Sequence, residues 1–242
     1  MTHDLLLVQY GARRSNKTLS PPCAKAQMAL HLKGLEYRVH NCASPREVRR
    51  YNLRGRVPAL FIDGEAIVDS FEILTELDRR FPDPPLEPAD AAERARCRIL
   101  EDWIDEVVYF LGAWTRWVHP EGFARIREVL VQASPFPLSL VIPTVARRML
   151  RKRLLGQGTA HKPADVVLRE LAEAYDRLEA LAGAAPYLCG EQLTRADLAA
   201  AALLDQLDSS LTPPSLRQDM DERPALRTWL ARVHEHVPNF AG

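Results

Sequence analysis

The sequence predicts an α/β domain followed by an all-α domain. Short apolar runs alternate with helix-like segments over the first 82 residues, and the remainder has helical periodicity. Between the two lies "FPDPPLEPAD", residues 81–90, whose four prolines exclude a helix or a central strand. We therefore place an α/β domain at residues 1–82 and a helical-bundle domain at residues 90–242.

The composition narrows the class of protein. The 32 basic and 32 acidic residues balance, which argues against a nucleic-acid-binding protein. The cysteines form no C-x-x-C pair and have no histidine cluster beside them, so we expect neither a disulfide framework nor a metal site; they are Cys23, Cys42, Cys97 and Cys189. The opening "MTHDLLLVQYG" predicts a strand rather than a signal peptide, and no apolar run reaches the roughly 18 residues of a transmembrane helix. We expect a reduced cytoplasmic protein.

The elements of the first domain follow in the order β-α-β-α-β-β-α. Strands are expected at "DLLLVQY", "EYRVHN", "PALFID" and "AIVD", the last two joined by the hairpin signal Asp63-Gly64. The first helix begins at Ser20, ahead of two prolines, and ends at Gly34. Two further helices begin at Ser44, which precedes a proline, and at Ser70.

The helices of the second domain are predicted from the periodicity of apolar residues and from capping signals. An apolar face on one long helix over residues 90–118 is expected at Ile99, Trp103, Val107, Phe110, Trp114 and Trp117. "SPFPLSLVIP", residues 134–143, interrupts the pattern. Further helices are predicted at residues 165–181, after Thr194, which forms a capping box with Asp197, and after Pro224. The basic run "RRMLRKR", residues 147–153, is expected to be a solvated face, with contact to an anionic membrane surface as the alternative.

Ser20 is a candidate catalytic residue. Its helix follows the first strand, so the helix N-terminus should lie at the ligand-binding end of the sheet, where its partial positive charge favours a thiolate. The alternative is a cap that accepts a hydrogen bond from the backbone N–H of Cys23.

Two dipeptides are candidate binding residues. Val57-Pro58 precedes a strand; a cis bond there would turn the Val57 backbone outward as an edge for an extended peptide, and the alternative is a plain turn proline. Asp69-Ser70 lies where a strand meets a helix. Ser70 and the helix amides would bind a carboxylate while Asp69 binds an ammonium group, unless the pair serves only as a cap.

Three stretches together resemble the glutathione transferase superfamily: "SPPCAKAQMALHLKGLEYRV", "NLRGRVPALFIDGEAIVDSFEILTEL" and "YLCGEQLTRADLAAAALL". The resemblance implies a thioredoxin-like N-terminal domain, a helical domain that supplies the acceptor pocket, glutathione as co-substrate, and a homodimer. It also implies residue roles. Ser20 would stabilise the glutathione thiolate, the Val57 backbone before cis Pro58 would pair with the cysteinyl part, Asp69 and Ser70 would hold the γ-glutamyl end, and Arg56 would meet the glycyl carboxylate.

The sequence departs from the family at Asp69, where glutamate is usual, and in a longer loop before Ser20, a metaxin-like feature. We predict a detoxifying glutathione transferase that conjugates the thiolate to a small apolar electrophile. Trp114 and Trp117 are candidates to line the acceptor pocket, whereas Trp103 is expected in the core. The alternatives are a non-catalytic, metaxin-like binding protein and a glutathione-dependent thiol reductase. The reductase would use Cys23, the fallback nucleophile, which we otherwise expect to be buried and inert.

Overall fold

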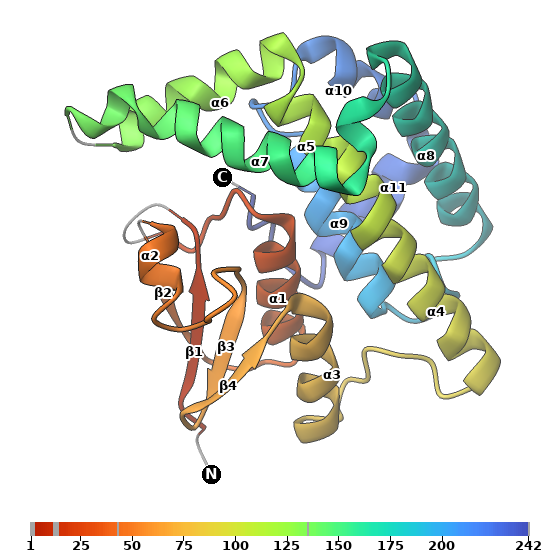
Figure 1. Cartoon of the computed structure of the whole chain (residues 1–242). Coiled ribbons are helices and arrows are strands. Elements are labelled where there is room, and N and C mark those ends of the chain that lie inside the picture. Colours follow the sequence, from red (N-terminus) through yellow and green to blue (C-terminus); the bar gives the residue numbers. More distant parts are fainter. Residues whose placement is uncertain (1–2, 12–14, 43, 135, 242) are drawn as a thin grey trace. The chain divides into compact units, whose positions relative to one another are not determined.

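The computed structural model describes residues 3–11, 15–42, 44–134 and 136–241 (Figure 1). Its first part has the predicted element order β-α-β-α-β-β-α. The elements are β1 (Leu5–Gln9), α1 (Pro21–Leu32), β2 (Arg38–Asn41), α2 (Pro45–Val48), β3 (Ala59–Ile62), β4 (Glu65–Val68) and α3 (Ser70–Arg80). The residues 12–14 of the predicted loop lie outside the described part of the chain.

The four strands form one mixed sheet in the order β2-β1-β3-β4. Strand β1 is parallel to β2 and antiparallel to β3, which pairs with β4 through the expected hairpin. The turn needs left-handed backbone at Asp63 (φ 52°) and Gly64 (φ 86°), which explains the Asp-Gly signal. Helices α1 and α3 pack together on one face of the sheet (Figure 1), and their buried side chains, Met28, Leu30, Ile73, Leu74 and Leu77, form the core with Leu7 and Leu60.

The rest of the chain is helical, as predicted. The helices are α4 (Ala91–Trp103), the π-helical turn η1 (Ile104–Val108), α5 (Tyr109–Trp117), α6 (Pro120–Ala133), the short turn η2 (Leu138–Leu140), α7 (Ile142–Gln157), η3 (Thr159–His161), α8 (Ala164–Ala184), α9 (Arg195–Leu207), α10 (Pro214–Asp221) and α11 (Pro224–His234). One half of the predicted capping box is present at α9, where the Asp197 carboxylate accepts hydrogen bonds from the backbone N–H and the hydroxyl of Thr194.

The predicted apolar face over residues 90–118 is wrong in part. Ile99 is 68% exposed and Val107 is 44% exposed, whereas Cys97 and Glu101 are buried. One cause is the π-helical turn, which rotates the helix faces of α4 and α5 relative to each other. The other is that the buried face of α4 carries a carboxylate, which hydrophobic periodicity cannot detect.

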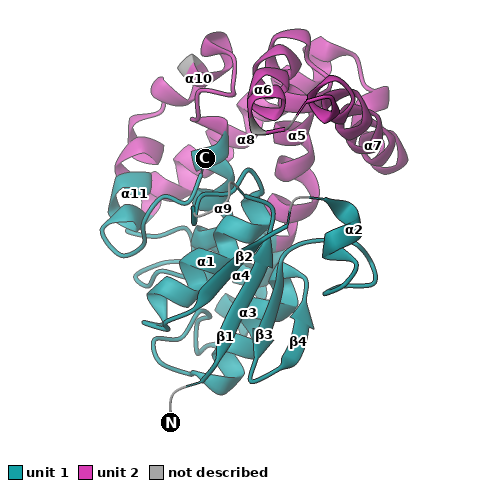
Figure 2. Ribbon diagram, turned by 90° about the vertical axis from the view of Figure 1, so that its left-hand side faces the viewer, with its two compact units in different colours: residues 1–101, 185–206, 229–242 teal, residues 102–184, 207–228 magenta. Residues whose placement is uncertain are grey.

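The chain divides into two compact units that cut across the sequence (Figure 2). The first comprises residues 1–101, 185–206 and 229–242, and the second comprises residues 102–184 and 207–228. The first unit therefore includes α4, most of α9 and the end of α11 in addition to the sheet domain placed at 1–82 from the sequence. Among the described helices, none combines the length and the apolarity needed to cross a membrane.

Candidate functional site

The sheet register brings three chain segments to one end of the first unit. Val8 of β1 lies opposite Ala59 of β3, and Ala59 lies opposite Val68 of β4. Since β1 and β4 end where β3 begins, Tyr10, Val57-Pro58 and Asp69-Ser70 all leave the sheet at this end. These are the segments in which the sequence placed its binding residues.

A polar loop returns Ser20 to the same end of the sheet. The Thr18 hydroxyl donates to the Tyr10 carbonyl at 2.6 Å and accepts from the Ser20 N–H at 3.2 Å. Buried Gln206 of α9 donates to the Thr18 carbonyl at 2.6 Å, and the Thr18 N–H donates to the Phe240 carbonyl. Ser20 is thus fixed beside the end of β1 by bonds from three separate parts of the first unit.

The alternative role for the Ser20 hydroxyl, capping α1 by accepting from the Cys23 N–H, is not observed. Ser20 is the N-cap of α1, but its carbonyl, not its hydroxyl, accepts from the N–H groups of Cys23 and Ala24, both at 3.0 Å. Pro21 and Pro22 have no N–H at all. Among the described residues, the first turn of α1 therefore offers no unbonded backbone amide, and its remaining donor is the half-buried Ser20 hydroxyl, which hydrogen-bonds with the Cys23 thiol.

Cys23 is fully buried one turn into α1. Burial raises the pKa of its thiol to about 12, and hydrogen bonds with the Ser20 and Thr18 side chains offset that effect only in part. Such a thiol is protonated at neutral pH and has no access to a substrate disulfide. This geometry argues against the fallback assignment of Cys23 as a nucleophile.

Val57 presents a free backbone edge at the mouth of β3. The Val57-Pro58 bond is cis. Within the described residues, neither the N–H nor the carbonyl of Val57 has a hydrogen-bond partner, although the residue is half-buried. Buried Asn52 shapes the preceding loop, because its side chain donates to the Arg56 carbonyl at 2.8 Å and accepts from the Arg54 N–H at 3.0 Å. An extended peptide could pair with Val57 as an added strand.

Asp69 and Ser70 form the N-terminus of α3. Asp69 has φ 85°, a left-handed conformation that is costly for a residue with a side chain, and it caps the helix by accepting from the Phe71 N–H at 3.0 Å. Ser70 is only 6% exposed, yet neither its N–H nor its hydroxyl has a partner in the described part of the chain. A helix end with an open amide and hydroxyl suits a carboxylate.

Arg56 lies on the exposed rim of the same end, between Asn52 and Val57. Arg49, Arg50 and Arg54 belong to the same short segment and are also exposed. The rim is therefore rich in guanidinium groups, whereas the exposed Asp69 supplies a carboxylate. This charge pattern complements a peptide with one ammonium group and two carboxylates.

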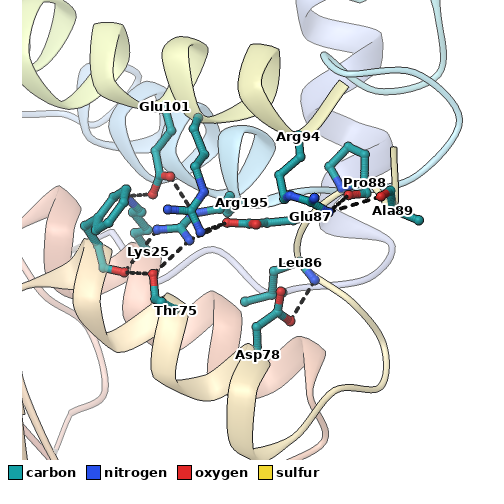
Figure 3. Close-up of polar contacts among 12 residues, drawn as sticks. Lys25, Thr75, Asp78, Leu86, Glu87, Pro88, Ala89, Arg94, Glu101 and Arg195 are labelled. Atoms are coloured by element: carbon teal, nitrogen blue, oxygen red, sulfur yellow. Dashed lines mark hydrogen bonds and ion pairs between the residues drawn. The ribbon is translucent and has the colours of Figure 1, made fainter. Parts of the chain in front are cut away.

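A buried ion-pair network joins the two helices whose N-termini form the site (Figure 3). Glu101 of α4 is fully buried and contacts Lys25 of α1 and the Arg195 Nε of α9, the latter at 2.5 Å. Arg195 also pairs with Glu87 at 2.7 Å. It donates to the Phe71 carbonyl at 3.0 Å and lies 4.4 Å from the centre of the Phe71 ring. Arg195 thereby holds the first turn of α3, directly after Ser70.

Sequence reasoning missed Asn52, Thr18, Glu101 and Arg195. Asn52 follows a short helix in a glycine-containing loop, a composition that indicates a side chain bonding to nearby backbone. Arg195 was visible as the first residue after the Thr194 cap, but nothing local shows that it is buried. Glu101 gave no signal, because an acidic residue on a helix is usually exposed.

One group of side chains could in principle hold a metal ion. The ligand atoms of His40, Cys42 and Glu47 lie within 4.8 Å of one another, and His40 Nε2 is 2.9 Å from Glu47 Oε1. Burial and the nearby Glu47 charge raise the pKa of the Cys42 thiol to about 11. Cys42 packs with Val8 and Val48 in the apolar cluster on this face of the sheet, so a thiolate ligand is disfavoured here.

The aromatic residues expected near an acceptor pocket lie in the second unit. Trp114 is buried and Trp117 is half-buried. Their role as pocket residues stays a prediction. Trp103, expected in the core, is only half-buried.

Comparison with known proteins defines the class of protein. A family model of the glutathione S-transferase N-terminal domain matches residues 19–80, and one of the C-terminal domain matches residues 139–236. Protein LigF of Sphingobium sp. strain SYK-6 is 26% identical over 192 residues, which cover 77% of this chain and 72% of LigF. Glutathione S-transferase Z2 of Arabidopsis thaliana is 40% identical over 81 residues, covering 30% of this chain and 36% of that protein.

Solved structures show the same fold. The crystal structure of the beta-etherase LigF has a TM-score of 0.67 at 24% identity and covers 97% of this chain and 95% of its own. Rice GST1, solved in complex with glutathione, has a TM-score of 0.63 at 22% identity and covers 99% of this chain and 92% of its own. A thioredoxin-like sheet domain with a helical domain is the glutathione transferase fold. This chain belongs to the glutathione transferase superfamily and is a glutathione S-transferase by family.

Proposed function

We propose that this protein conjugates the thiolate of glutathione to a small apolar electrophile. Glutathione would lie extended along the Val57 edge, with its γ-glutamyl carboxylate on Ser70 and its ammonium group on Asp69. Its glycyl carboxylate would meet Arg56, and its sulfur would face Ser20. The observation that carries this proposal is the common location of these groups at one end of the sheet. In the described part of the chain, the Val57 backbone and the Ser70 N–H and hydroxyl have no hydrogen-bond partner.

The chain's part in the reaction is to keep the sulfur ionised. A free thiol has a pKa of about 8.5, so lowering the value to about 7 raises the thiolate fraction at neutral pH by roughly tenfold. The Ser20 hydroxyl would donate to the thiolate, and the thiol proton would pass to solvent. The sulfur would then form a bond to the electrophilic carbon, and the leaving group would take the bonding pair.

Glutathione binding and conjugation of chlorodinitrobenzene test the proposal in the parent and in Ser20→Ala. We expect the parent to bind glutathione and turn over, and Ser20→Ala to bind with similar affinity but to lose about 10²–10³-fold in kcat/KM. Ser44→Ala is the matched control, since Ser44 caps α2 through a side-chain bond to the Glu47 N–H and lies outside the proposed site.

The outcomes separate the hypotheses. A parent protein that binds no glutathione contradicts the whole proposal. Binding without turnover of any electrophile supports the metaxin-like binding protein instead. Full activity in Ser20→Ala would remove Ser20 from the mechanism without affecting the binding site. A mixed disulfide on Cys23 after treatment with oxidised glutathione would revive the reductase hypothesis.

Cleavage of an ether by the same thiolate is the second candidate function. The sequence similarity to LigF, a beta-etherase, extends over 77% of this chain, further than the match to Glutathione S-transferase Z2. In this reaction, the sulfur attacks the ether carbon and a phenolate leaves. A fluorogenic aryl ether would release its phenol only if the acceptor region accommodates such a substrate. The homodimer and the cytoplasmic location stay predictions of the family resemblance.

A further inference from the structure

Helices α6 and α7 form an antiparallel hairpin in the second unit, and residues 136–141 lie at its tip (Figure 1). The base of the hairpin is fixed to α5. A Cβ on Gly122 would lie 1.8 Å from the Thr115 carbonyl oxygen, so the two helices touch through backbone. The Arg147 guanidinium donates to the carbonyls of Trp117 and Val118 and stacks 4.0 Å above the Phe123 ring. The hairpin is thus a fixed part of the unit.

This hairpin exposes an unusual amount of apolar surface. Among the described residues, ten large hydrophobic side chains are strongly exposed, and seven of them lie between residues 136 and 155: Phe136, Leu138, Leu140, Val141, Val145, Met149 and Leu155. Phe136 is 82% exposed and Leu140 is 70% exposed. An exposed apolar patch of this kind marks an interaction site rather than an ordinary surface.

The same face carries positive charge and no negative charge. Arg148 and Lys152 alternate with Val145 and Met149 at three- and four-residue steps, so all four project from one exposed side of α7. No aspartate or glutamate occurs between Glu128 and Asp165. We define the hairpin surface as Phe136, Leu138, Leu140, Val141, Val145, Arg148, Met149 and Lys152.

We propose that the hairpin surface binds a membrane surface rich in anionic lipids, with α7 lying in the headgroup plane. The aliphatic side chains would enter the acyl boundary, while Arg148 and Lys152 would reach lipid phosphates with their long side chains. A second copy of the chain fits less well, because a two-fold contact would pair this face with itself, and the face carries no acidic residue to meet Arg148 and Lys152. A nucleic acid would pair with the cations but leave the aliphatic residues in water.

Vesicle co-sedimentation of the full chain tests the proposal. We expect binding to vesicles of phosphatidylcholine and phosphatidylglycerol in equal parts, little binding to phosphatidylcholine alone, and release at about 0.5 M salt. Arg148→Glu/Lys152→Glu should weaken the partition coefficient by at least about tenfold. Leu138→Ser/Leu140→Ser should also weaken it, with little effect on folding, since both side chains are exposed.

Control variants make the same kinds of change in charge and in apolar surface outside the hairpin. Arg96→Glu/Arg169→Glu makes the same charge change at side chains that are 70% and 62% exposed outside the hairpin, and Ile99→Ser removes an exposed apolar side chain elsewhere. These variants should bind vesicles as the parent does.

Three results would overturn the proposal. The first is equal binding by the charge-reversed and parent proteins. The second is a dimer, seen by light scattering, that Leu138→Ser/Leu140→Ser dissolves while no vesicle binding occurs. The third is tighter binding to a mixed-sequence oligonucleotide than to anionic vesicles.

Discussion

Two helix N-termini lie at the same end of the sheet, and they offer a ligand different groups. At α1, Pro21 and Pro22 remove two amides and the Ser20 carbonyl accepts from the next two. The donor left for a ligand is the Ser20 hydroxyl, which would exchange its hydrogen bond with the Cys23 thiol for one to the ligand. At α3, the Asp69 carboxylate accepts from the Phe71 N–H, and within the described residues the N–H and the hydroxyl of Ser70 have no partner.

The difference shows how one fold can offer different hydrogen-bond donors to two anionic groups of a ligand. A carboxylate is fully ionised at neutral pH and benefits from several fixed donors, which α3 supplies. A thiol must be ionised first, and a single well-placed hydroxyl beside a helix dipole does this without occupying the sulfur, which must still react. The proposed assignment of sulfur to α1 and carboxylate to α3 follows from this contrast.

The largest expected effect comes from removing the cation that supports the α3 end. Arg195→Met leaves Glu101 and Glu87 without a buried partner on α9 and removes the bond to the Phe71 carbonyl. We expect a loss of about 3–5 kcal/mol in the free energy of unfolding, measured with urea. Arg98→Met is the control, because Arg98 pairs with Glu87 from a 39% exposed side chain and should lose less than about 1 kcal/mol. Equal losses in the two variants would contradict a structural role for the network.

A smaller effect tests the carboxylate end directly. Ser70→Ala removes a hydroxyl that we expect to bond a charged group, which is worth about 1.5–3 kcal/mol, or roughly 10–100-fold in the glutathione Kd. Isothermal calorimetry measures the change. Repeating it with a glutathione analogue that lacks the γ-glutamyl carboxylate should abolish the difference between parent and variant, and a persistent difference would show that Ser70 acts elsewhere.

A further prediction concerns the backbone amides that the two prolines remove from the first turn of α1. Pro22→Ala restores an N–H at the second position of the helix, beside Ser20. In the Ser20→Ala background, it should lower the pKa of the bound thiol and recover conjugation by about fivefold, corresponding to about 1 kcal/mol. Absorbance of the thiolate against pH reads out the pKa. No recovery would mean that the sulfur does not lie at the first turn of α1.

The smallest effect concerns pH and reaches the α1 end of the site through α9 and α11. His234 of α11 contacts Asp205 of α9 at 2.9 Å, and that hydrogen bond raises the pKa of His234. A raised folded-state pKa gives stability that is complete below the ordinary value near 6.5 and is lost as pH rises through the higher folded value. The segment after α11 holds Thr18, because the Phe240 carbonyl accepts from the Thr18 N–H. The local stability around Thr18 and Ser20 should therefore fall slightly with rising pH. Hydrogen exchange at Thr18 should show this trend in the parent and not in His234→Gln.

Local signals predicted the elements of the first domain and the helical class of the second, but not which side of its first helix is buried. The Ser44-Pro45 cap, the Asp63-Gly64 hairpin and the Ser20-Pro21 start each depend on a few neighbouring residues, and all are present. The buried face of α4 was mispredicted because Glu101 is buried only through Lys25 and Arg195, which are distant in sequence.

The sequence alone determined where the elements of the sheet domain begin, because capping and turn geometry are fixed by adjacent residues. Only the tertiary structure decided which groups stay unbonded at the end of the sheet. In the described part of the chain, the Val57 backbone and the Ser70 N–H and hydroxyl have no partner, Cys23 is buried, and the Ser20 hydroxyl does not cap α1. Each of these depends on residues that folding brings close together, and the strand register sets how close the segments lie.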